Sequence, residues 1–197
     1  MAASHMKNRR QASVAIAVST FLKSGIAYAI DSSEGATKYR RLPLDFNIDS
    51  LRIPHPPTDN ITEARLLLKM QAHRTPLQIA QIKAQSVNPI PLFWKCAGLN
   101  ESCFPEQAQL LNEAVADTES ILIELKSRFN RPRPSVVLPD IHAVVPVPWH
   151  TSYPSGHATQ SIVIAALLSQ IAPKSSRQLV DLAVQVGRNR EIAGRVP

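Results

Sequence analysis

Three short stretches of the sequence contain side chains that could bind a phosphate group and assist its transfer. The first is KSRFNRPRP, residues 126–134, which gathers Lys126, Arg128, Arg131 and Arg133 within eight residues. Ammonium and guanidinium groups donate strong hydrogen bonds to phosphate oxygens. The same cluster is also consistent with a solvated basic helix end, because cations are favoured near a helix C-terminus. The stretch alone leaves both interpretations open.

The second stretch is YPSGH, residues 153–157. Gly156 lets the backbone approach a ligand closely, and the unpaired N–H groups of a helix that begins here favour an anion. Ser155 could cap this helix or donate to a phosphate oxygen. His157 would lie in the first turn, where it could protonate a leaving oxygen. Alternatively, Ser155 is only the cap and nearby backbone satisfies His157.

The third stretch is GRNREIAG, residues 187–194, near the end of the sequence. Steps of three or four residues place Arg190 on the same helical face as Leu179, Leu182 and Val186. This face is expected to be buried. A buried guanidinium is costly unless it is paired with a carboxylate or with a bound anion. The sequence does not choose between these two partners.

Taken together, the three stretches resemble the signature of the type-2 phosphatidic acid phosphatase and vanadium haloperoxidase superfamily. That signature reads Lys, six residues, Arg-Pro; then Pro-Ser-Gly-His; then Ser-Arg, five residues, His. The matching residues are Lys126 with Arg133-Pro134, then Pro154-Ser155-Gly156-His157, then Asn189-Arg190 with Asn in place of Ser. The resemblance covers roughly residues 54–194. Within the superfamily the chain is most similar to bacterial class A acid phosphatases, which are soluble and periplasmic.

The resemblance implies a role for each matching residue. The phosphate oxygens would be held by Lys126, Arg133, Ser155, Gly156 and Arg190. His157 would be the general acid that protonates the departing alcohol. Because fixed positive groups would stabilise the transferring phosphoryl group, no metal or other cofactor is expected, although vanadate could occupy the phosphate site. The expected partners are small phosphorylated organic molecules or free phosphate.

The third motif departs from the family at its most reactive position. The family's nucleophile is a histidine that forms a phosphohistidine, and its place here is taken by Val196. A valine side chain cannot attack phosphorus. His142 and His150 precede the PSGH motif, but in-line attack demands close placement, so neither is favoured as a substitute.

The aspartate that orients the family's nucleophile, and a further helix, would fall beyond Pro197. The chain is therefore expected to be C-terminally short. It could be a truncated or frame-shifted product, a natural variant that binds phosphate without turnover, or a sequence that omits its end. Without that further helix, the apolar face that it would cover is exposed, which would favour marginal stability or a homo-oligomer.

The function expected on this basis is hydrolysis of phosphate monoesters, by the phosphohistidine mechanism that the resemblance implies. The absence of the nucleophilic histidine leaves the activity of this chain open. The alternatives are a vanadate-dependent haloperoxidase and a catalytically inactive phosphate-binding remnant. A lipid phosphatase is disfavoured, because the sequence lacks multiple apolar segments long enough to span a membrane.

The N-terminal region has the pattern of an export signal. Basic residues precede an apolar run over residues 12–22, and the AYA of residues 27–29 fits the small-x-small cleavage rule. We therefore expect a signal peptide over residues 1–29 and a periplasmic or secreted protein, with a membrane anchor or an amphipathic helix as the alternatives. The MAASHM of residues 1–6 is typical of a cloning remnant. The net charge of +7 falls when this segment is removed, and the remaining positive charge is too mild to indicate nucleic-acid binding.

Cys96 and Cys103 are the two cysteines of the chain, and they enclose six residues. In an exported protein this spacing predicts one small disulfide loop. Two unpaired thiols are the alternative.

Helical periodicity predicts an all-α bundle over residues 61–197, and the resemblance implies that this bundle is of the phosphatidic acid phosphatase and haloperoxidase type. Residues 30–60 are expected to form an extended arm. The predicted helices begin near Ile61, Pro76, Pro105, Gly156 and Ser175, with Ser175 as the cap of the last. Pro89 and Pro91 are expected to break the chain before the cysteines, and residues 130–153 to form a loop rich in proline.

Overall fold

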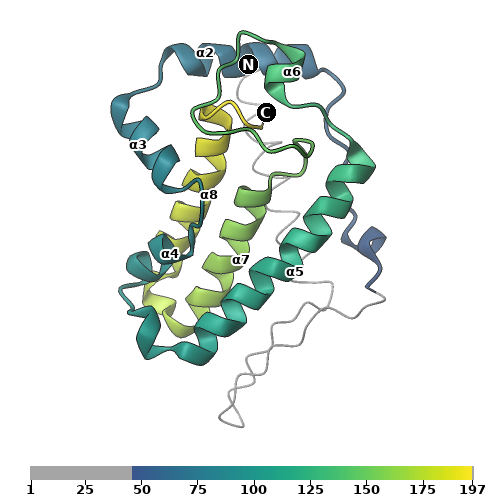
Figure 1. Ribbon diagram of the computed structural model, residues 1–197. Helices are drawn as coiled ribbons and strands as arrows, with labels where there is room; N and C mark the ends of the chain where they lie inside the picture. The colour runs from purple at the N-terminus through teal and green to yellow at the C-terminus, as the bar shows by residue number, and fades with distance from the viewer. Residues whose placement is uncertain (1–45, 197) are drawn as a thin grey trace.

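The computed structural model describes residues 46–196 (Figure 1). The predicted signal peptide and residues 30–45 of the predicted arm lie outside the described residues. Within the described part every regular element is an α-helix or a short 3-10 helix and there is no strand, which confirms the all-α prediction. None of the described helices is long and apolar enough to cross a bilayer.

The elements follow one another along the chain with short connections, apart from one long loop before α7. They are η1 (Ile48–Leu51), α2 (Asn60–Ala72), α3 (Pro76–Ala84), α4 (Ile90–Ala97), η2 (Glu101–Cys103), α5 (Pro105–Phe129), α6 (Pro134–Val137), α7 (Gly156–Ile171), η3 (Pro173–Ser175) and α8 (Ser176–Ile192). The predicted helices correspond to α2, α3, α5, α7 and α8.

The prediction that two prolines break the chain before the cysteines was wrong. Pro89 lies at the N-cap of α4 and Pro91 in its first turn. The first N–H groups of a helix have no partner within the helix, so proline loses nothing there. The apolar face of α4 then buries Phe93 and Trp94 in the core.

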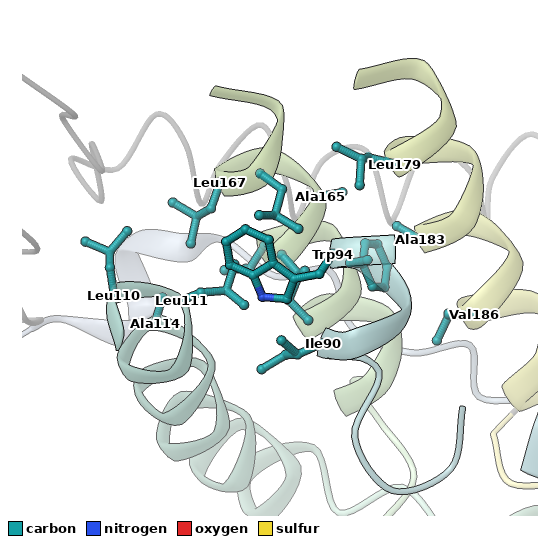
Figure 2. Close-up of a cluster of buried hydrophobic side chains, with 14 of the residues drawn as sticks. Ile90, Trp94, Leu110, Leu111, Ala114, Ala165, Leu167, Leu179, Ala183 and Val186 are labelled. Carbon is teal, nitrogen blue, oxygen red and sulfur yellow. The ribbon is translucent and has the colours of Figure 1, made fainter. Parts of the chain in front are cut away.

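The main core lies between α4, α5, α7 and α8. Figure 2 shows Trp94 of α4 surrounded by apolar side chains from the other three helices, among them Leu111, Leu167 and Leu179. Consecutive helices α7 and α8 pack closely along their length. A Cβ on Gly187 of α8 would lie only 3.3 Å from the Cβ of Ala158 in the first turn of α7.

The loop between α6 and α7 returns across the ends of the helices. Val144 N–H donates to the carbonyl of Ala193 (3.1 Å), which joins the loop to the residues just after α8. Arg131, just before α6, forms a buried ion pair with Glu63 of α2. These bonds tie the segment that precedes the PSGH sequence to α2 and to the end of α8.

The structure corrects the predicted disulfide, because Cys96 and Cys103 are both free. Cys96 is half-buried on α4, where it packs against the core, whereas Cys103 ends η2 and is exposed. The two thiols therefore lie in different environments. Ser175 precedes α8 as predicted, but it does not cap the helix with its side chain; its hydroxyl instead donates to the carbonyl of Ala97 (3.3 Å).

Candidate active site

A single pocket of about 110 Å³ brings together every residue that the sequence motifs singled out for phosphate chemistry. These residues are Lys126, Arg133, Ser155, Gly156, His157 and Arg190. They come from the ends of α5, α7 and α8 and from the residue just before α6, so most of them are far apart in the sequence.

Three helix ends meet at this pocket, at one end of the bundle (Figure 1). Lys126 lies in the last turn of α5 and Arg190 in the last turn of α8. Ser155 is the N-cap residue of α7, and Gly156 and His157 open that helix. Arg133 lies at the N-cap position of α6. Tight packing of α7 on α8 near Gly187 holds the first turn of α7 beside the end of α8.

Lys126 is only 4% exposed. Its ammonium donates to the backbone carbonyls of Thr151 (3.2 Å), Ser152 (3.4 Å) and Pro154. Burial, followed by the charges of Arg133 and Arg195, lowers the pKa of Lys126 to about 7. With this pKa the ammonium loses its proton near neutral pH, and a bound anion would favour the protonated form.

Arg133 is buried and its donors are largely occupied by backbone. Its Nε donates to the carbonyl of His150 (2.8 Å) and its Nη1 to the carbonyl of Arg195 (2.8 Å). Burial, then the charge of Arg195, lowers the pKa of Arg133 to about 10. The side chain stays charged at neutral pH and adds a fixed positive field to the pocket.

Arg190 lies on the buried face of α8, as its helical spacing predicts, and is 2% exposed. Its Nη2 donates to the carbonyl of Ile82 (3.1 Å), whereas Nε and Nη1 have no hydrogen-bond partner among the described residues. Burial, then the charge of Arg195, lowers the pKa of Arg190 to about 10. Leaving charged donors buried and unpaired is costly, so this guanidinium is suited to an anion in the pocket.

His157 and Ser155 lie at the start of α7. His157 Nε2 is 3.1 Å from the carbonyl of Ser86, so the imidazole already has one backbone partner. Burial, then the charge of Arg190, lowers the pKa of His157 to about 4, so the ring is neutral at pH 7. Ser155 is the N-cap residue of α7, but its hydroxyl makes no capping hydrogen bond.

The basic cluster KSRFNRPRP separates into two pairs. Lys126 and Arg133 line the pocket. Arg128 is partly exposed and pairs with Asp49 and Glu124, and Arg131 is buried against Glu63. Only half of the cluster is therefore available to a ligand, which the spacing of the residues could not show.

The motifs missed one cationic residue of the pocket. Arg195 lies just after α8 and lines the pocket, as do His150 and Val196. His150 Nδ1 is 3.0 Å from Nη2 of Arg133, and burial lowers the pKa of His150. The only signal for Arg195 in the sequence is its position close to the end of the third stretch, residues 187–194.

Comparison with protein-family models relates part of the chain to a known superfamily. The family model of the PAP2 superfamily matches residues 109–193. No curated protein matches the chain. The matched segment begins within α5 and ends just after α8, and it contains all six pocket residues that the motifs identified. A match to this superfamily indicates phosphatase-type activity in general terms, whereas Arg195 and Val196 lie outside it.

Proposed function

We propose that this chain is a phosphate monoester hydrolase of the acid phosphatase type, most similar to the bacterial class A enzymes. The observation that carries the proposal is the buried guanidinium of Arg190. It has two donors without a partner among the described residues, and Arg190 lines the same pocket as Lys126, Arg133 and His157. A tetrahedral phosphate dianion would supply both the missing acceptors and the missing negative charge.

Binding of the phosphate group follows from the arrangement of donors. The oxygens would accept hydrogen bonds from Arg190 and from the Ser155 hydroxyl, which makes no capping bond. The backbone N–H groups at the start of α7 would add further donors, and the positive end of the helix dipole favours the anion. The Lys126 ammonium and the Arg133 guanidinium would balance the remaining charge.

His157 is the proposed general acid. A dianion in the pocket would offset the nearby cations that contribute to its low pKa, and would thereby raise that pKa toward the range useful for proton transfer. His157 would then protonate the leaving alkoxide oxygen as the P–O bond breaks.

The attacking group cannot be the residue at position 196, because Val196 has no nucleophilic atom. Turnover would need water or another pocket residue as the nucleophile. If neither attacks, the chain binds phosphate without turnover, which is the second candidate function. A haloperoxidase is disfavoured for the same reason, because the imidazole that would bind vanadium in that family is absent.

The proposed ligands are small phosphorylated organic molecules or free phosphate. If residues 1–29 act as an export signal, the protein would encounter them in the periplasm or outside the cell.

The test is hydrolysis of p-nitrophenyl phosphate by the full chain, with its mass recorded. We expect turnover that His157→Ala reduces by at least 10²-fold, which is the usual contribution of a general acid. His142→Ala is the matched control, because His142 is an exposed loop histidine that does not line the pocket. A folded chain that binds phosphate but gives no turnover would support the phosphate-binding alternative. Absence of phosphate binding would contradict both functions.

A further inference from the structure

Arg195 is held in the pocket by two of the other cationic residues. Its backbone N–H donates to the carbonyl of Arg190 (3.1 Å), and its carbonyl accepts from Nη1 of Arg133 (2.8 Å). The residue is 8% exposed and lines the same pocket. Its position is therefore fixed by backbone bonds within the site.

The side chain of Arg195 is not similarly satisfied. Its Nε is buried and has no hydrogen-bond partner among the described residues. The guanidinium also acts on its neighbours, because its charge lowers the pKa values of Lys126, Arg133 and Arg190. The folded protein thus keeps a buried cation that repels the other cations of the site.

Arg131 shows what a buried structural arginine looks like in this chain. It is as buried as Arg195, but it forms an ion pair with Glu63, and its Nε donates to the side-chain oxygen of Asn60 (3.1 Å). A carboxylate and an amide thus compensate its charge and donors. The guanidinium of Arg195 instead shares a pocket with three other cations.

We propose that Arg195 is a further phosphate-binding residue, which donates from its guanidinium to an oxygen of the bound phosphoryl group beside Arg190. The inference rests on the proposed phosphate site. It gives the site four cationic side chains, and the ligand that such a site takes best is a phosphoryl group in its dianionic form.

The experiment measures binding of inorganic phosphate to the full chain by titration calorimetry at constant ionic strength. Arg195→Met keeps much of the apolar length and removes the charge and the donors. We expect this variant to bind phosphate at least tenfold more weakly than the wild-type chain. Arg188→Met is the matched control, because Arg188 lies on α8, is exposed, pairs with Glu191 and does not line the pocket. The control should bind phosphate within twofold of the wild-type chain.

Thermal melting separates this role from a structural one. Removal of an uncompensated buried cation should leave the melting temperature of the unliganded protein equal or higher, while the increase caused by phosphate becomes smaller. If Arg195 instead had a structural role, the variant should melt at a lower temperature, and phosphate should raise its melting temperature as much as it does for the wild-type chain. If Arg195→Met does not fold, Arg195→Lys is compared instead, and we expect a loss of threefold or more because lysine lacks the planar set of donors.

The outcomes distinguish the two proposals. A wild-type chain that binds phosphate, together with an Arg195 variant that binds it within twofold, overturns the role of Arg195 and leaves the phosphate site intact. A wild-type chain that does not bind phosphate overturns both.

Discussion

At the scale of single residues, the buried cations of this protein are compensated in three different ways. Arg131 has a carboxylate partner in Glu63. Lys126 and Arg133 are surrounded by backbone carbonyls, whose dipoles stabilise charge less fully than an anion does. Arg190 and Arg195 retain unpaired buried donors. The buried cations that line the pocket are therefore less fully compensated than Arg131, as expected if a ligand supplies the missing negative charge.

The lowered pKa of Lys126 makes the stability of the protein without added phosphate depend on pH. The folded-state pKa is about 7 and the ordinary value is 10.5, so the unfolded chain binds more protons between these pH values. The contribution of Lys126 to the free energy of unfolding therefore rises as pH increases from about 7 to 10.5. Lys126→Met should remove this rise, which urea unfolding at pH 7, 8.5 and 10 would measure. Equal pH slopes in the wild-type chain and the variant would contradict the prediction.

At the scale of elements, the charged side chains at the ends of α5 and α8 have the sign that the helix dipole favours. Lys126 and Arg190 lie at the C-terminal ends of α5 and α8, where cations are favoured. The start of α7 meets them with its positive end, where an anion is favoured. An anion between these ends would therefore interact favourably with the start of α7 and with the two cations, which offset the negative ends of α5 and α8.

The close approach of α7 and α8 depends on Gly187. A methyl group at this position would lie 3.3 Å from the Cβ of Ala158, so the helices would have to separate by a few tenths of an ångström.

Gly187→Ala should be nearly neutral, because better helix propensity of up to ~1 kcal/mol offsets the crowding. Gly187→Leu should lower the free energy of unfolding by ~1–3 kcal/mol through overpacking, measured by chemical denaturation. It should also weaken phosphate binding, because Ala158 follows His157 in the first turn of α7. A Gly187→Leu variant as stable as Gly187→Ala would show that the helices can separate freely there.

Much of this arrangement could be predicted from the sequence, because local patterns determine it. Periodicity located five helices, and the PSGH motif placed the start of α7. α4 was missed because the same prolines can break a chain or open a helix, and only the burial of Phe93 and Trp94 decides between the two. The sequence also did not show that Arg133 lines the pocket whereas Arg131 does not. That difference depends on the ion pair between Arg131 and Glu63, which is 68 residues away in the chain. Arg195 lies beyond the periodic segment, so no local pattern marked it.

At the scale of the whole molecule, the described fold is held together without a covalent crosslink between its cysteines. Trp94 and its neighbours from four helices form the continuous core (Figure 2). The arm before α2 contributes to this core, since Ile48 and Leu51 are buried in it. The stability of the described part therefore comes from packing between helices and not from a disulfide loop.

Reducing agent should accordingly leave the melting temperature unchanged. Alkylation of the denatured chain without reductant should modify both cysteines, which intact mass would count. In the folded protein Cys103 should react before Cys96, because Cys96 is partly buried and burial raises the pKa of its thiol. A lower melting temperature with reductant, together with failure of both thiols to alkylate, would show that Cys96 and Cys103 form a disulfide.

The two arginines joined by the bond from Arg133 Nη1 to the carbonyl of Arg195 are 62 residues apart in the chain. A ligand held by both guanidinium groups would close a loop of that length, as a non-covalent crosslink does, and would restrict the opening of every helix within it. Departure of the ligand would then be coupled to local separation of α8 from the segment that precedes α6. The residence time of phosphate would follow the rate of that opening motion, and the loop between α6 and α7 would become resistant to proteases for as long as the ligand stays bound.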